Sequence, residues 1–411
     1  MRILQISTQA PGNHGGGEMG IAQTLLSLTG NHYEVDYAGP EIADAGYRSL
    51  YSHVYALPPS ANVPLRIFDT LCGYTNSRYR AWKRFAAETD LSRYDCAVMD
   101  FTKLDYCLPA IRGIPLAVRV HNVEADYARK DYETNHGFRK AVICRNAMAA
   151  ERKIAEAADV LVCLTENDRK RLQELYPAAD AAKYRIVPVC ISRSPESPEA
   201  AAAASVRHTD TVPPAGAGHP ETTDGNAASA QVRLLITGSL WFEENVRGIL
   251  WFLDEVLPVL TVPCTLTIAG ARPADVLRER VRALPQVSLV SSPESMAPYF
   301  RAADAVIAPV FDGAGMKVKV AEALSYGKPV IGTSHAFIGY GITQSVNSWQ
   351  ADTKEEFAAA VHAFAALDQK GKLQTSRAAF QLYQDQYSMA KSTALWNDIL
   401  TEITEASFMK D

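Results

Sequence analysis

A lysine and a glutamate stand three positions apart behind a pair of glycines. Gly313 and Gly315 precede Lys319 and Glu322 in the segment DAVIAPVFDGAGMKVKVAEALSYGKPV, which predicts a strand, a turn, a helix and a strand. Glycines permit a tight turn into a helix N-terminus, where N–H groups and the helix dipole attract a diphosphate. Residues three apart share one helix face, so the cation suits phosphate and the carboxylate suits sugar hydroxyls. The same spacing also fits a surface ion pair.

A second glycine-rich loop, Gly12 to Gly17, follows the first predicted strand and precedes a helix that we expect to begin near Glu18. Its backbone either cradles a phosphate or forms a flexible turn between strand and helix. The spacing is not GxGxxG, and Asp36 lies within the next strand instead of closing it. The loop therefore disfavours a dinucleotide cofactor.

Three polar residues, His121, Asn122 and Glu124, cluster at the carboxyl end of the predicted strand PLAVRVHN. Ligands of open α/β sheets bind at this edge. A lone histidine is usually structural, but the three residue types together favour a functional role.

These segments resemble the GT-B retaining glycosyltransferases, particularly family 4, over nearly the whole chain. In that family a glycine turn is followed by a lysine, then Glu-Ala, then Gly-x-Pro-Val. The matching residues are Gly313, Gly315, Lys319, Glu322, Ala323, Gly327, Pro329 and Val330. The first glycine loop, the HNVE strand end and the segment TGSLWFEENVRGILWF are also similar to family features.

The resemblance implies transfer of a sugar from a nucleoside diphosphate sugar with retention of configuration, the donor phosphate helping to take the acceptor proton. Glu322 would hold the donor ribose, Lys319 the diphosphate, and His121 would contact the sugar, so these three form the expected catalytic set. The expected donor-binding residues are Gly16, Gly17, Gly238, Asn245, Gly270, Gly313, Gly315, Met316, Lys317, Lys319 and Glu322.

Two positions depart from the family pattern. Ala314 stands where the first of two glutamates is usual, which leaves the identity of the sugar open. The segment 239–245 lacks the usual basic pair, and either Arg247 or Lys317 is the expected substitute. Because no DxD motif occupies a credible strand-end loop, we expect no metal and no other cofactor, with lysines bearing the charge of the leaving diphosphate.

The acceptor is expected to bind the first domain, through Asn122, Glu124, Arg78 and Trp82. The segment RYRAWKRF at 78–85 mixes cations with aromatic residues, which suits a saccharide or lipid-linked acceptor or peripheral contact with a membrane. The simpler interpretation is a solvated basic helix face. Two other functions stay open: a nucleotide-sugar epimerase of the same fold, and a non-catalytic partner subunit of an active transferase.

Alternating strand and helix patterns must position these residues. Predicted strands at 2–7, 33–39, 53–58, 94–100, 115–122, 160–165 and 184–189 precede a second set at 233–239, 264–270, 287–292, 304–310 and 329–334. The pattern predicts two Rossmann-like doubly wound parallel-sheet domains facing a cleft, at 1–190 and 231–385. Between them, 191–230 predicts a flexible or disordered linker, and 386–411 a C-terminal helix that packs across both domains.

Composition excludes several other classes of protein. A net charge of -5 provides no general attraction for nucleic acid, and the seven cysteines form no CxxC pair. No apolar stretch approaches the ~20 residues of a membrane span, and the N-terminus lacks a signal-peptide pattern. We therefore expect a cytoplasmic enzyme, either free or at the inner face of the membrane.

Overall fold

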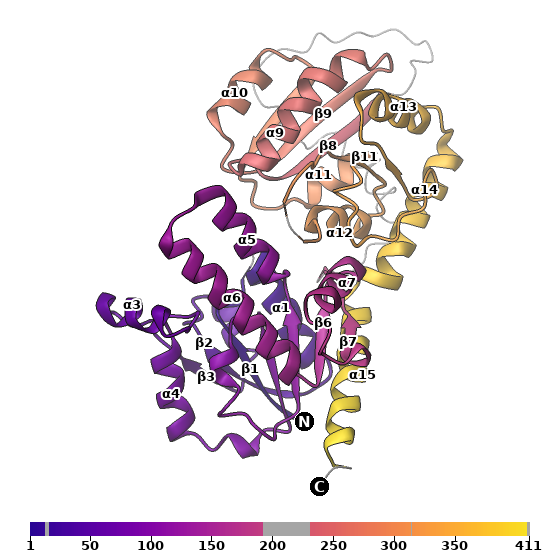
Figure 1. The fold of residues 1–411 in the computed structure, drawn as a ribbon. Coiled ribbons are helices and arrows are strands. Elements are labelled where there is room, and N and C mark those ends of the chain that lie inside the picture. The colour runs from indigo at the N-terminus through magenta and orange to yellow at the C-terminus, as the bar shows by residue number, and fades with distance from the viewer. Residues whose placement is uncertain (13–15, 192–230, 314, 409–411) are drawn as a thin grey trace. The chain divides into compact units, whose positions relative to one another are not determined.

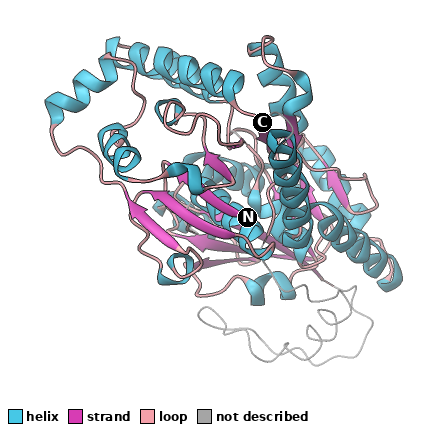
Figure 2. Cartoon of the chain, turned by 90° about the horizontal axis from the view of Figure 1, so that it is seen from below, coloured by secondary structure: helices cyan, strands magenta, loops and turns pink. Residues whose placement is uncertain are grey.

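The computed structural model describes residues 1–12, 16–191, 231–313 and 315–408. The chain divides into two compact units, the first formed by Met1–Cys190 with Met389–Asp411 and the second by Ile191–Ser388. Figure 1 shows that both units combine strands with helices, and Figure 2 shows the same helices and strands from below. The linker predicted at 191–230 lies, apart from Ile191, outside the described residues.

The first unit contains a seven-stranded parallel sheet in the order β3-β2-β1-β4-β5-β6-β7. Each strand falls within a predicted segment, which confirms the fold class for this half. The strands are β1 Arg2–Ser7, β2 Glu34–Gly39, β3 His53–Ala56, β4 Cys96–Asp100, β5 Leu116–Val120, β6 Val160–Cys163 and β7 Tyr184–Ile186.

Side chains of the central strands fill two apolar cores on opposite faces of this sheet. In β4, Cys96 and Val98 belong to one core, while Ala97 and Met99 belong to the other. This alternation follows from the two-residue period of a strand. The helices of the unit are α1 Gly16–Gly30, α2 Ala45–Arg48, α3 Val63–Leu71, α4 Tyr79–Glu88, α5 Glu124–Asn135, α6 Phe138–Ala157, α7 Glu166–Leu175 and α15 Met389–Phe408.

The second unit contains a six-stranded parallel sheet in the order β10-β9-β8-β11-β12-β13. The strands are β8 Val232–Ser239, β9 Cys264–Ala271, β10 Val287–Ser291, β11 Ala305–Ala308, β12 Val330–Gly332 and β13 Ser348–Gln350. The sequence does not predict β13. The helices are α9 Glu243–Trp251, α10 Asp275–Arg282, α11 Ala297–Ala302, α12 Val318–Ser325, α13 Lys354–Ala365 and α14 Gln369–Leu382.

The C-terminal helical stretch is divided between the units. Helix α14 belongs to the second unit and continues through a wide turn, Tyr383–Tyr387, to Ser388. Helix α15 belongs to the first unit, where the Ser392 hydroxyl lies 2.7 Å from the Ser27 hydroxyl of α1. None of the helices in the described part of the chain is both long and apolar enough to cross a membrane.

Strand order reverses once in each sheet. In the first sheet the reversal lies between β1 and β4, and in the second between β8 and β11. Ligands of doubly wound sheets bind beyond the carboxyl ends of the strands at such a switch point. The first glycine loop follows β1, and the Gly313 turn follows β11. The topology therefore brings both predicted phosphate loops to switch points.

Candidate functional site

The turn that precedes α12 depends on backbone angles that glycine adopts most readily. Gly313 and Gly315 have φ values of +96° and +70°, where a side chain would introduce strain. Ala314, between them, lies outside the described residues. Tyr340, which the sequence analysis does not identify, fixes the helix start: its hydroxyl donates to the Lys317 carbonyl oxygen at 2.9 Å and accepts from the Ala321 N–H at 3.3 Å.

Lys319 points toward the carboxyl end of β8. Its Nζ donates to Oδ1 of Asn245 at 2.8 Å, and Nδ2 of Asn245 donates to the Ser239 carbonyl oxygen at 3.1 Å. A Cβ at position 238 would lie 3.1 Å from the same ammonium nitrogen. Gly238, Asn245 and Lys319 are far apart in sequence, and the structure brings them together.

Gly270, on the neighbouring strand β9, packs against Gly238. It pairs with Gly238 across β8 and β9, and a Cβ there would lie 1.9 Å from the Gly238 carbonyl oxygen. No side chain fits at that distance. The role that the structure shows for Gly270 is close strand packing, and its predicted contact with a donor stays a prediction.

Lys317 completes a pair of ammonium groups at the turn. Its Nζ donates to the carbonyl oxygens of Gly313 at 2.7 Å and Gly315 at 3.0 Å. Burial lowers the pKa of Lys317 to about 8. Burial, and then the neighbouring charge of Lys317, lowers the pKa of Lys319 to about 8. Two partly buried cations beside a helix N-terminus favour the binding of a multiply charged anion.

The side chains around this turn include both substitutes that we expected for the basic pair. Nη2 of Arg247 lies 3.7 Å from Oδ2 of Asp312, so Arg247 also reaches the turn. His335, which sequence reasoning missed, places its Nε2 2.7 Å from the Gly313 carbonyl oxygen. Arginine, lysine and histidine side chains from α9, α12 and the segment after β12 therefore surround the turn.

Two further predicted donor residues lie on or beside α12. Glu322 is half-buried, three residues after Lys319 and therefore on the same face of the helix. Met316 is buried, with 7% of its surface exposed.

His121 is held inside the first unit. Its Nε2 lies 3.0 Å from Oδ1 of Asp100, and its ring stacks on Phe101 with centroids 4.2 Å apart. A Cβ at position 20 would lie 2.6 Å from Nδ1, so both ring nitrogens face protein atoms. Burial lowers the pKa of His121 more than the hydrogen bond and charge of Asp100 raise it. The imidazole is therefore neutral, buried, and held in place by Asp100 and Phe101. Its contact with a donor stays a prediction.

A buried carboxylate, missed by sequence reasoning, occupies the N-terminus of α5. Glu151 accepts from the N–H groups of Glu124 at 2.8 Å and Ala125 at 3.0 Å. Glu124 itself is 3% exposed and forms an ion pair with Lys103, Nζ to Oε2 2.6 Å. Its predicted contact with an acceptor stays a prediction. Asn122 is half-buried beside it.

The first glycine loop is partly described. Helix α1 begins at Gly16, two residues before the predicted start. A Cβ at Gly16 would meet nothing within 4 Å, whereas one at Gly17 would lie 2.6 Å from Oε1 of Gln9. Gly16 therefore offers open backbone at the helix start, and Gly17 allows close packing.

The acceptor residues predicted in the segment 78–85, Arg78 and Trp82, have different surroundings in the structure. Trp82 is 2% exposed and packs in the core, with its ring centroid 5.4 Å from that of Phe85. The structure therefore shows a core role for Trp82, and its predicted contact with an acceptor stays a prediction. Arg78 is half-buried and donates from Nε to the Leu57 carbonyl oxygen at 2.9 Å.

Among the described residues, no group of three or more His, Cys, Asp or Glu side chains could hold a metal ion.

Comparison with known proteins gives a family match for the segment that contains the Gly313 turn. Residues 231–366, within the second unit, match the family model "Glycosyl transferases group 1". No curated protein sequence matches the chain.

Solved structures of similar fold cover nearly the whole chain. Sucrose-phosphate synthase from Thermosynechococcus elongatus is 15% identical with a TM-score of 0.67, covering 98% of this chain and 99% of that one. WaaG, a glycosyltransferase involved in lipopolysaccharide biosynthesis, is 17% identical with a TM-score of 0.61, covering 97% and 99%. Anabaena HepE in complex with UDP and glucose is 11% identical with a TM-score of 0.62, covering 98% and 100%. Such identities establish a shared fold, so the chain has the GT-B architecture, and its segment 231–366 matches the family of glycosyl transferases group 1.

Proposed function

We propose that this protein is a retaining glycosyltransferase that moves a sugar from a nucleoside diphosphate sugar to a saccharide, lipid-linked saccharide or protein glycan in cell-surface glycan assembly. The observation that carries the proposal is the pair of ammonium groups, Lys317 and Lys319, beside the N-terminus of α12 at a switch point. The fold and the family match of 231–366 support the same class.

The geometry suits the charge changes of sugar transfer. Departure of a nucleoside diphosphate places negative charge on its phosphate oxygens, and fixed cations stabilise that charge most where water is scarce. Lys319 is held toward β8 by Asn245, so little reorganisation is needed when the charge develops. We propose that these lysines replace a metal ion, and that Glu322 binds the ribose.

We propose a uridine nucleotide as the donor, in line with the ligands of one structural neighbour. HepE is described in complexes with UDP, with UDP and glucose, and with UDP-glucose. WaaG and the galactosyltransferase WaaB are described in lipopolysaccharide synthesis, which supports the proposed class of acceptor.

A thermal-shift screen with UDP, GDP, dTDP and ADP sugars tests donor binding. A ligand at a hundredfold excess over its Kd stabilises the protein by about 2.7 kcal/mol, which raises the midpoint by several degrees. We expect a uridine nucleotide to give the largest shift in wild type and a much smaller one in Lys319→Ala.

Transfer is then followed by NMR of the anomeric proton, with and without EDTA. An unchanged anomeric configuration and unchanged rate in EDTA are the expected results. Release of free UDP with a 2-epimer and no acceptor would indicate the epimerase, and the absence of any nucleotide shift would indicate the non-catalytic subunit. A rate abolished by EDTA would contradict the metal-independent mechanism.

Donor affinity is expected to weaken as the pH rises through 8. Both lysines have a pKa lowered to about 8, so each loses its positive charge above that pH. Between about pH 7 and about pH 9 the charged fraction of one such lysine falls about tenfold, and the Kd for UDP should rise at least as much. Isothermal titration calorimetry in buffers of different ionisation enthalpy measures both the affinity and the accompanying proton uptake. A Kd that stays constant over this range contradicts the assignment, and Lys319→Met should reduce the pH dependence.

A further inference from the structure

Helix α3 has its apolar side turned away from the protein. Four large apolar side chains, at Val63, Ile67, Phe68 and Leu71, are 50%, 57%, 59% and 50% exposed. With 100° between residues, these four positions lie on one side of the helix. The one buried residue of α3 is the charged Asp69, at 5% exposure.

The polar side of α3 attaches the helix to its neighbours. Asp69 accepts two hydrogen bonds from Arg80 of α4, from Nε at 2.9 Å and from Nη2 at 2.8 Å. Nδ2 of Asn146, on α6, donates to the Thr70 carbonyl oxygen at 2.6 Å. Asn62 caps the helix N-terminus by accepting from the Leu65 N–H at 3.0 Å. The helix is therefore well anchored, and its outward apolar side is a stable feature of the fold.

An apolar stripe of this kind indicates a contact surface, because exposing it to water costs free energy that burial in a partner would recover. We call the four apolar residues of α3, together with Arg66, Lys83 and Arg84, the α3–α4 patch. Lys83 and Arg84 are exposed on α4, and neither pairs with a carboxylate in the part of the chain that the structure describes. Asp69, the nearby acid, is already neutralised by Arg80.

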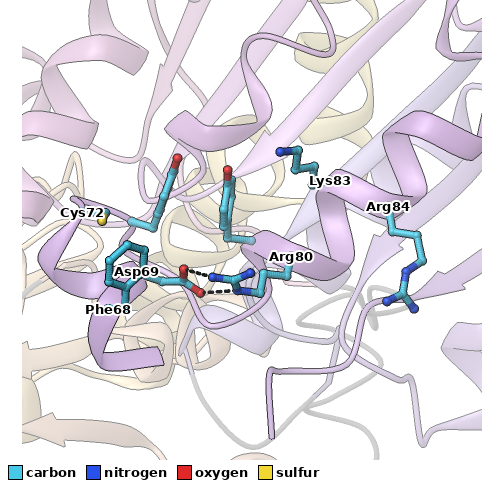
Figure 3. A pocket seen from close by; sticks show the side chains of 8 residues that line it. Phe68, Asp69, Cys72, Arg80, Lys83 and Arg84 are labelled. Carbon is cyan, nitrogen blue, oxygen red and sulfur yellow. Dashed lines mark hydrogen bonds and ion pairs between the residues drawn. The ribbon is translucent and has the colours of Figure 1, made fainter. Parts of the chain in front are cut away.

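The apolar and cationic parts of the patch meet at a cavity of about 490 Å³, which Phe68, Cys72, Lys83 and Arg84 help to line. Figure 3 shows Phe68 and Cys72 at one side of it, Lys83 and Arg84 on α4 at the other, and the paired Asp69 and Arg80 between them. Apolar side chains beside unpaired cations are the composition of helices that lie in the headgroup layer of anionic membranes.

We propose that the α3–α4 patch docks this protein onto the surface of an anionic lipid bilayer. The apolar stripe of α3 enters the boundary between headgroups and acyl chains, and Lys83 and Arg84 contact lipid phosphates. A second copy of the chain fits this surface less well, because a symmetric contact would bring the unpaired cations of both copies together. The proposal does not depend on the proposed transferase activity.

Flotation of the full chain with lipid vesicles tests this inference. Wild type is expected to float with phosphatidylcholine vesicles that contain about 30% phosphatidylglycerol at about 0.1 M salt, and to be released at about 0.5 M salt. The apolar variant Ile67→Ser/Phe68→Ser and the charge variant Lys83→Glu/Arg84→Glu should each lower the partition coefficient on the order of tenfold or more.

Matched controls change equally exposed residues elsewhere. Val276→Ser and Val346→Ser remove apolar side chains that are 51% and 50% exposed in the second unit, and Arg112→Glu reverses an exposed charge in the first. These three variants should float like wild type. Because all substituted residues are exposed, thermal midpoints should stay close to that of wild type.

The proposal is overturned if wild type fails to float, if it binds pure phosphatidylcholine equally well, or if the patch variants bind as tightly as wild type. It is also overturned if sedimentation reveals a dimer that Ile67→Ser/Phe68→Ser dissociates while no vesicles are bound.

Discussion

Replacing Lys319 by alanine is expected to lower kcat/KM for sugar transfer by about 10²–10³-fold, the effect of removing one well-placed donor to a developing oxyanion. The ammonium group donates a hydrogen bond to Oδ1 of Asn245, a residue of α9. It lies near the carboxyl end of β8 and beside the helix start that we assign to the diphosphate. Steady-state rates with the donor found in the ligand screen provide the measurement. Lys370→Ala, which removes an exposed lysine of α14, should keep the wild-type rate.

This loss should come without loss of stability. The pKa of Lys319 is about 8 in the fold and 10.5 in the unfolded chain, so the unfolded chain binds that proton more tightly. Below pH 8 the charged lysine therefore costs folding free energy, and this cost disappears as the pH rises toward 10.5. Lys319→Ala should unfold at the wild-type temperature or above it. If the variant is equally active, the assignment of Lys319 to the diphosphate is wrong.

Replacing Asp100 by alanine should destabilise the first unit by about 3–5 kcal/mol, which lowers its thermal midpoint on the order of 10 °C. Asp100 is fully buried and accepts hydrogen bonds from Gln5 Nε2 at 2.7 Å and, at Oδ1, from His121. Arg119 is also fully buried; burial lowers its pKa, and the charge of Asp100 opposes that shift. Without the carboxylate, the guanidinium would be left in the core without a counter-charge.

Differential scanning calorimetry can resolve this effect from the transition of the second unit. Glu133→Ala, which removes an exposed carboxylate of α5, should stay within about 0.5 kcal/mol of wild type. Adding Arg119→Met to Asp100→Ala should recover part of the loss, because removing both buried charges leaves neither of them without a counter-charge. A midpoint of Asp100→Ala equal to that of wild type would show that Asp100 does not compensate Arg119.

Hydrophobic patterning predicted the sheets well, because parallel strands buried on both faces are short apolar runs between helices. The one strand missed, β13, is three residues long and includes the polar Ser348 and Gln350, so it lacks that signal. The end of a helix was harder to predict: the stretch from 372 to 404 contains no glycine or proline, yet α14 ends in a wide turn and α15 starts anew at Met389.

The candidate site was predictable where its residues are close in sequence, as in the Gly313 turn and α12. Partners contributed by distant segments were not: Tyr340 and His335 reach the turn from the segment after β12. For His121, the sequence did offer a signal for its partner: Asp100 is a carboxylate at the end of a predicted apolar strand. The segment 78–85 mixes cations and aromatic residues in sequence, but the helix separates them: Trp82 and Phe85 face the core, and Lys83 and Arg84 face outward.

The first unit is made of two pieces of chain, and this has a consequence for biosynthesis. Trp396 and Leu400 of α15 fill the same core as Ile3 and Val98, yet a ribosome makes them after the whole second unit. At 5–20 residues per second, the roughly 200 intervening residues take about 10–40 s. For that time one face of the seven-stranded sheet lacks its closing helix. The second unit is therefore the first to have its complete sequence outside the ribosome, and until α15 follows, the nascent first unit exposes the apolar surface that this helix covers in the finished protein.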